Sequence, residues 1–161
     1  MSSYLRQFDA ISVAIQVQQQ SSLETATPIV LGDTGTGKTS CVEQLSEYFN
    51  LSYMGWSVAQ SMPELVGGLP YANLEEGVVN MLPSDRFLPV VEGGNWLVCL
   101  DELPDASRNM QSALHLLLTH GQAGSLQLPK HVQVACGNPP QVSTTGGTLS
   151  PAVSTRMCQI L

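Results

Sequence analysis

A glycine-rich segment between an apolar run and a helix-forming run limits this chain to very few folds. Residues 32–39 read Gly-Asp-Thr-Gly-Thr-Gly-Lys-Thr, a full match to the pattern GxxxxGK(S/T). Residues 28–31 before the segment are apolar, and residues 38–50 after it carry apolar side chains at helical spacing. A strand, a glycine loop and a helix in this order direct backbone N–H groups at phosphate. The segment therefore predicts a phosphate-binding loop in an α/β domain.

The residue types of this loop suit a nucleoside triphosphate. Glycines let the backbone approach the phosphates, and the Lys38 ammonium can reach the β and γ oxygens. The Thr39 hydroxyl is a ligand for Mg²⁺. An accidental glycine turn is the alternative, which the placement between strand and helix disfavours. The predicted phosphate-binding residues are Gly32, Asp33, Thr34, Gly35, Thr36, Gly37, Lys38 and Thr39.

Two carboxylates follow a second apolar run, at residues 96–100. The continuous apolar character indicates a buried parallel strand, whose carboxyl end lies at the same sheet edge as the phosphate loop. We expect Asp101 to orient Mg²⁺ and Glu102 to act as general base on the attacking water. An Asp-Glu pair after a strand is also a common helix start, but its place downstream of the glycine loop favours catalysis.

Asn138 follows a third apolar run, at residues 132–136. Its side chain would emerge at the same sheet edge and could bond the nucleophilic water and the γ-phosphate. Asn before Pro139 is also an ordinary turn signal. The coincidence with the other two segments favours the functional role.

Strand-like and helix-like runs alternate along the rest of the chain, which predicts right-handed βαβ units with helices on both faces of a parallel sheet. We expect one domain over residues 1–161, a three-layer αβα sandwich with five parallel strands. An apolar, Gly- and Pro-containing insert at residues 67–83 predicts a short helix or a hairpin, and residues 121–130 predict a small hairpin. The expected strands are 28–31, 51–58, 96–100, 131–136 and 157–161, and the expected helices 3–19, 38–50, 84–92, 103–121 and 150–155.

The charge balance argues against direct nucleic-acid binding. Thirteen acidic against six basic residues give a net charge of −7. The basic residues are scattered singly, whereas nucleic-acid binding needs clustered cations. No apolar run is long enough to span a bilayer or to form a secretory signal, so we expect a cytoplasmic protein without membrane contact.

Cysteine and histidine show no metal or redox pattern. Four cysteines lie far apart, without a CxxC pair. We predict that they are buried thiols. The three histidines have no neighbouring carboxylate or hydroxyl pattern that indicates catalysis.

With these residues in place, the chain resembles the AAA+ ATPases, and among them the MoxR-like and dynein-related group. The resemblance rests on GDTGTGKT (32–39), WLVCLDEL (96–103), VACGNPP (134–140) and LSPAVSTRM (149–157). In that group the first three are the Walker A, Walker B and sensor 1 motifs. The resemblance implies a P-loop NTPase fold with strand order 5-1-4-3-2, a helix-2 insert at residues 67–83 and a pre-sensor-1 hairpin at residues 121–130.

The resemblance also implies an activity and partners. Members bind ATP with Mg²⁺, hydrolyse it to ADP, and remodel proteins as oligomeric, commonly hexameric, rings. Such ATPases often act on a protein substrate together with a partner that contains a von Willebrand A-type domain. Tyr71, Leu74 and Leu126 are candidate contacts for such a partner, although internal packing explains each of them equally well.

Two departures from the family pattern qualify these expectations. The last motif, LxxAxxDRF in the family, is matched here by Leu149, Ala152 and Arg156, but Thr155 replaces the Asp and Met157 the Phe. We expect Arg156 to act as an arginine finger on a neighbouring copy, with Arg108 as second candidate and a surface role as the alternative. The family's helical lid with its sensor 2 arginine has no counterpart in residues 1–161. This predicts weak nucleotide binding and slow turnover for the chain alone.

Two other functions stay open on the sequence alone. A P-loop kinase would transfer phosphate to a substrate, but the Asp101–Glu102 pair suits water as acceptor. A nucleotide-gated scaffold would bind ATP with little hydrolysis. A GTPase is disfavoured because no NKxD segment is present.

Overall fold

A five-stranded parallel sheet forms the centre of the computed structural model, which describes residues 3–21, 25–143 and 147–160. Numbered in chain order, its strands lie in the order 5-1-4-3-2, as the resemblance implied, and the predicted fold class is confirmed. In the same direction, starting from the fifth of these strands, they are β9 (Met157–Ile160), β1 (Thr27–Leu31), β8 (Val132–Gly137), β5 (Trp96–Asp101) and β2 (Ser52–Ser57).

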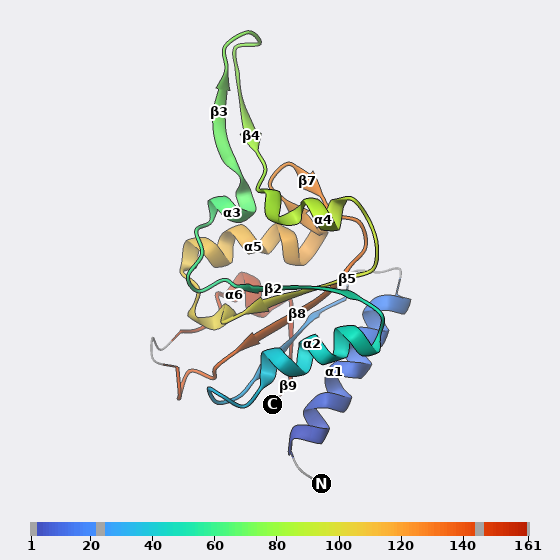
Figure 1. Cartoon of the computed structure of the whole chain (residues 1–161). Coiled ribbons are helices and arrows are strands. Elements are labelled where there is room, and N and C mark those ends of the chain that lie inside the picture. Colours follow the sequence, from blue (N-terminus) through green and yellow to red (C-terminus); the bar gives the residue numbers. More distant parts are fainter. Residues whose placement is uncertain (1–2, 22–24, 144–146, 161) are drawn as a thin grey trace.

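Helices cover both faces of this sheet (Figure 1). On one face, α1 (Ser3–Gln20) and α2 (Lys38–Tyr48) bury apolar side chains such as Ile15 and Leu45 against the strands. On the other, α5 (Arg108–His120) buries its apolar stripe together with the short helices α3 (Glu64–Gly67), α4 (Leu88–Val91) and α6 (Pro151–Ser154). The predicted three-layer arrangement follows from these two apolar cores.

The central strands are continuous apolar runs because both of their faces are covered. In β5, Leu97 and Cys99 face the α1–α2 layer, whereas Val98 and Leu100 face the α5 layer. All four side chains are fully buried. Asp101 follows these four residues at the carboxyl end of β5, where it is only partly buried at the sheet edge.

Two hairpins stand outside the central sheet. The insert forms an antiparallel pair, β3 (Leu69–Asn73) with β4 (Val78–Leu82), which extends from the body at the top of Figure 1. Of the two predicted alternatives for residues 67–83, the hairpin is therefore the one that forms. The second predicted hairpin is β6 (Gln122–Ala123) with β7 (Leu126–Gln127).

The helix predicted over residues 103–121 is interrupted. A 3₁₀ turn, η2 (Leu103–Asp105), comes first, and the backbone is extended at Ala106. Helix α5 then begins at Arg108, because the Ser107 hydroxyl caps it by accepting a hydrogen bond from the Met110 N–H. The prediction missed this second N-cap inside an apolar pattern.

The helix predicted over residues 84–92 is shorter than expected. The structure has a 3₁₀ turn, η1 (Asp85–Phe87), followed by the single turn of α4. Residues 144–146 of the predicted loop and Leu161 of the predicted last strand lie outside the described residues.

Cys158 corrects the prediction that all four cysteines are buried. It lies on the edge strand β9 and is exposed, whereas Cys41, Cys99 and Cys136 are buried. An edge strand has one side without a neighbouring strand, which sequence periodicity does not reveal. Among the helices of the described residues, none has the length and apolar character to cross a bilayer.

Candidate functional site

A polar cleft of about 260 Å³ lies where β1, β5 and β8 end and α2 begins. Parallel strands place their carboxyl ends at one sheet edge, so three segments distant in sequence meet there. The structure thus brings together most of the predicted site residues. The cleft is lined by Thr34, Gly35, Gly37, Lys38, Thr39, Ser40, Asp101, Glu102, Gly137 and Asn138.

The glycine loop has a backbone that other residues adopt only with strain. Gly35 and Gly37 have φ of 80° and 79°, in the left-handed region. A side chain at either position would meet nothing within 4 Å, so conformation rather than space requires glycine. Gly37 is the N-cap of α2 and supplies no side-chain cap, so first-turn N–H groups stay available to an anion.

Lys38 connects the loop to the end of β8. Its ammonium donates to the carbonyl oxygens of Gly32 at 2.9 Å and Asp33 at 2.8 Å, and to the Asn138 Oδ1 at 3.2 Å. Thr36 stabilises the same turn by donating its hydroxyl to the Asp33 carbonyl at 2.9 Å. Gly32, Asp33 and Thr36 therefore hold the loop in shape, although they do not line the cleft.

Thr39 and Asp101 form the pair of oxygen groups predicted for magnesium. The Thr39 hydroxyl donates to the Asp101 Oδ2 at 2.6 Å. Within the described residues no group of three or more His, Cys, Asp or Glu side chains could hold a metal. A hydroxyl and a carboxylate fit Mg²⁺, which uses few protein oxygens and completes its shell with phosphates and water.

Glu102 has a strained backbone and a fixed side chain. Its φ is 58°, in the left-handed region that side-chain-bearing residues rarely occupy. Its Oε2 accepts a hydrogen bond from the Ser57 hydroxyl at 2.6 Å, and its own N–H donates to the Asp101 Oδ1 at 2.9 Å. Ser57, at the end of the neighbouring strand β2, thus holds the Glu102 carboxylate at the cleft.

Ser57 was not predicted as a site residue, and neither were Ser40 and Gly137, which line the cleft beside predicted residues. Ser57 ends β2 and lies opposite Asp101 in the register of β2 with β5. A polar residue at the end of the strand beside β5 was the available signal. This signal points to the site only when β2 is known to lie beside β5 in the sheet.

Gly137 allows the end of β8 to contact η2 directly. A side-chain carbon at Gly137 would lie 2.3 Å from the Cδ of Pro104. The Gly137 carbonyl also accepts a hydrogen bond from the Gly32 N–H at 3.3 Å. This close approach fixes Asn138, the next residue, relative to both the phosphate loop and the segment after Glu102.

Neither candidate arginine lines the cleft. Arg156 is exposed between α6 and β9, and its carbonyl accepts from the Thr27 N–H at 2.9 Å, at the amino end of β1. That is the sheet edge opposite to the cleft. Arg108 is exposed at the start of α5, where it donates to the Thr148 hydroxyl at 2.8 Å.

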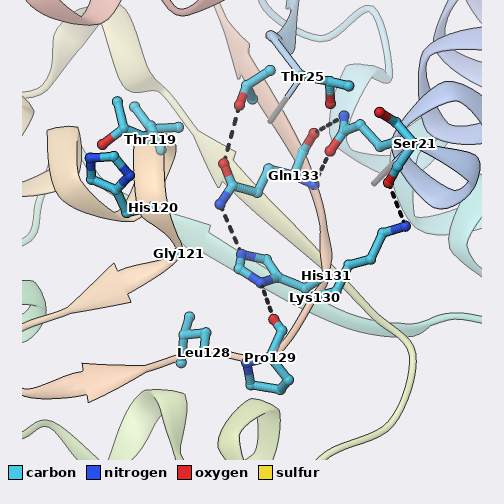
Figure 2. A pocket seen from close by; sticks show the side chains of 13 residues that line it. Ser21, Thr25, Thr119, His120, Gly121, Leu128, Pro129, Lys130, His131 and Gln133 are labelled. Atoms are coloured by element: carbon cyan, nitrogen blue, oxygen red, sulfur yellow. Dashed lines mark hydrogen bonds between the residues drawn. The ribbon is translucent and has the colours of Figure 1, made fainter. Parts of the chain in front are cut away.

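A second pocket, of about 280 Å³, lies at that opposite edge (Figure 2). The buried Gln133 side chain donates to the Leu117 carbonyl at 2.9 Å and lies 2.8 Å from the His131 Nε2. It accepts from the Thr27 hydroxyl at 3.1 Å, and its backbone bonds the Gln18 amide in both directions. Burial lowers the pKa of His131, which favours a neutral ring. The network joins α1, β1 and α5 to β8, and we assign it a structural role.

Cys99 and Cys136 lie on the adjacent strands β5 and β8, with their sulfur atoms 4.0 Å apart. The contact with Cys99 and burial raise the pKa of Cys136 well above its usual range. A thiol in this environment is a poor nucleophile. The prediction of buried thiols is confirmed for these two residues and for Cys41.

The comparisons with known proteins agree with this geometry. A family model described as "AAA domain (dynein-related subfamily)" matches residues 28–156. The match includes all the segments that line the cleft. No curated protein matches the chain significantly.

Proposed function

The chain belongs to the dynein-related subfamily of AAA domains, and on that premise we propose that it binds ATP with Mg²⁺ and hydrolyses it to ADP and phosphate. The observation that carries the proposal is the convergence of Lys38, Thr39, Asp101, Glu102 and Asn138 at one cleft. Few other activities require a phosphate loop, a metal-binding pair and a fixed carboxylate together.

Nucleotide binding is assigned to the loop and the start of α2. Backbone N–H groups of residues 32–39 bind the phosphates, and the positive end of the helix dipole adds to the attraction. The Lys38 ammonium, held by loop carbonyls and Asn138, is the charged donor for the phosphate oxygens. Thr39 and Asp101 hold Mg²⁺, which neutralises phosphate charge when bound.

Hydrolysis is assigned to Glu102 as general base. As the water oxygen bonds to the γ-phosphorus, its proton passes to the carboxylate, and the bond from that phosphorus to the ADP oxygen breaks. Ser57 orients the carboxylate through the 2.6 Å hydrogen bond. The Asn138 amide, at the cleft and bonded to Lys38, positions the water and the γ-phosphate.

We assign the arginine finger to Arg156 of a neighbouring copy. Its exposure, and its place at the sheet edge opposite to its own cleft, support action in trans. Arginine in this role neutralises charge on the transferred phosphoryl group. The assignment implies a ring, hexameric by resemblance, with a cleft between neighbouring subunits. Arg108 is the second candidate, since it is also exposed and outside the cleft.

The cellular role we propose is that of a MoxR-like remodelling ATPase or chaperone. The resemblance of the four motifs supports this role, and a protein substrate or a partner with a von Willebrand A-type domain is the proposed target. Tyr71 and Leu74 on the β3–β4 hairpin are 47% and 89% exposed, which suits contact with another protein, whereas Leu126 packs against the core.

A Glu102→Gln variant tests the catalytic assignment. We expect it to retain ATP binding, measured by calorimetry, and to lose phosphate release by about 10²–10⁴-fold, the usual contribution of a general base. Glu47→Gln, on the exposed side of α2, is the matched control and should behave like the unmodified chain.

Three results would contradict the proposal. If Glu102→Gln releases phosphate at the unmodified rate, Glu102 is not the general base. ATP binding without phosphate release by the unmodified chain in every oligomeric state favours a nucleotide-gated scaffold. Phosphate transfer to an added acceptor in preference to water favours a kinase.

A further inference from the structure

Gln111 is a polar side chain buried within the apolar layer that α5 forms on the sheet. Its exposed fraction is 1%, and Met110 and Leu114 on the same helix are fully buried apolar residues. A buried amide needs hydrogen-bond partners, because without them its removal from water is not compensated. The partners of Gln111 therefore indicate what this residue does.

The Gln111 amide bonds backbone groups of two segments, one next to it and one far along the chain. Its Nε2 donates to the Ala106 carbonyl at 3.1 Å and to the Thr148 carbonyl at 3.1 Å. Its Oε1 accepts a hydrogen bond from the Ser150 N–H at 2.6 Å. Because the amide donates at residue 148 and accepts at residue 150, it fixes the orientation of this segment as well as its distance. Gln111 thus joins α5 to residues 148–150.

Residues 148–150 lead directly into the short helix that precedes Arg156. Ser150 is the N-cap of α6, since its hydroxyl accepts from the Val153 N–H at 3.4 Å. Arg156 follows α6, and its N–H donates to the Val153 carbonyl at 2.9 Å. α6 has only four residues, too few for a helix to be stable without tertiary contacts, so its orientation depends on what holds its ends. Gln111 holds the first end, and α6 lies beside α5 (Figure 1).

The carboxylate assigned to proton transfer is held by contacts that do not involve Gln111. The Ser57 hydroxyl bonds the Glu102 carboxylate at 2.6 Å. Pro104, two residues later, contacts Gly137 at the end of β8. Loss of the Gln111 amide would therefore leave the cleft in place and release the start of α6.

We propose that Gln111 positions the arginine finger, because it fixes the start of α6 so that Arg156 reaches the cleft of a neighbouring copy. The inference rests on the proposed action of Arg156 in trans, and adds the residue that sets the direction of this arginine. Gln111 does not line the cleft, so it is a positioning residue. A change at Gln111 should therefore act on the cleft of the neighbouring copy and not on the cleft of its own copy.

Two inactive variants provide the assay. Lys38→Ala keeps the finger but loses the charged phosphate donor of the cleft, whereas Arg156→Ala keeps the cleft but loses the finger. In the reference mixture of these two chains, an active interface combines the finger of the first with the cleft of the second. Gln111→Met keeps the length of the side chain without its amide, and it can be added to either partner.

Gln111→Met should act only in the partner that supplies the finger. Added to Lys38→Ala, it should lower kcat for phosphate release by the mixture about tenfold or more, because a misplaced catalytic group loses much of its contribution. Added to Arg156→Ala, it should leave the rate equal to that of the reference mixture. KM for ATP should be the same in both mixtures, since the cleft is intact.

Leu117→Ala is the matched control, since it removes buried contacts from the same helix and leaves the hydrogen bonds to residues 148–150 in place. A loss of stability acts in whichever partner carries the change, so Leu117→Ala should lower the rate equally in both mixtures. Native mass spectrometry shows that both partners are present in the assemblies. Gln111→Leu, which should give the same result, replaces Gln111→Met if that chain does not assemble.

The outcomes separate this inference from the proposed function. If the reference mixture is active and the two Gln111→Met mixtures have equal rates, or if the change acts in the partner that supplies the cleft, the positioning role of Gln111 is overturned while the finger stands. If the reference mixture is inactive although mixed assemblies are present, the action of Arg156 in trans is overturned, and the role of Gln111 with it.

Discussion

Three polar pairs define the cleft at the level of single residues: Lys38 with Asn138, Thr39 with Asp101, and Ser57 with Glu102. Each pair joins two segments that are far apart in the chain. Because each side chain has a specific partner, the cleft is organised by side-chain hydrogen bonds as well as by the sheet. The left-handed backbone at Glu102 adds a strained conformation at the residue assigned to proton transfer.

Replacing Ser57 tests whether its hydrogen bond orients the general base. We expect Ser57→Ala to lower kcat for ATP hydrolysis by about tenfold, a part of the 10²–10⁴ that a positioned base contributes, with little change in KM. Ser57→Thr keeps the hydroxyl and should recover most of the rate. Equal kcat values for Ser57→Ala and the unmodified chain, in steady-state phosphate release, would show that the bond has no catalytic role.

At the level of elements, the contact between Gly137 at the end of β8 and Pro104 in η2 sets the position of Asn138. A side-chain carbon at Gly137 would lie 2.3 Å from the proline ring, so Gly137→Ala should lower the free energy of unfolding by about 1–3 kcal/mol. Urea denaturation measures this loss.

Gly67→Ala is the matched control for this substitution. A side-chain carbon there meets nothing within 4 Å, so stability should change by less than about 0.5 kcal/mol. Pro104→Ala combined with Gly137→Ala should recover part of the loss, since the two sites contact each other. A Gly137→Ala chain as stable as the unmodified one would mean that β8 and η2 can separate without cost.

The elements that position the site could largely be predicted from the sequence. The loop at residues 32–39 and the carboxylates after β5 follow from apolar runs and the polar residues that end them, which are local signals. Ser57 could not be found in this way, because its role depends on β2 lying beside β5. The break before α5 depends on a serine cap, and the exposure of Cys158 on which strand lies at the edge. These features are set by tertiary neighbours.

In the molecule as a whole, the cleft and the proposed arginine finger are far apart. The cleft lies at the carboxyl edge of the sheet, whereas Arg156 follows α6 at the opposite edge. One copy cannot bring its own Arg156 to its own cleft without unfolding the sheet between them. The proposed hydrolysis therefore takes place between two copies, one supplying the cleft and the other Arg156.

The ATPase rate of two inactive variants after mixing tests hydrolysis between copies. Lys38→Ala removes the phosphate-binding ammonium and Arg156→Ala the finger, so each should be nearly inactive alone while still assembling. In a random equimolar ring, about a quarter of the interfaces combine an intact cleft with an intact arginine. We therefore expect the mixture to recover about a quarter of the unmodified rate. A mixture as inactive as its components, with mixed assembly shown by native mass spectrometry, would contradict it.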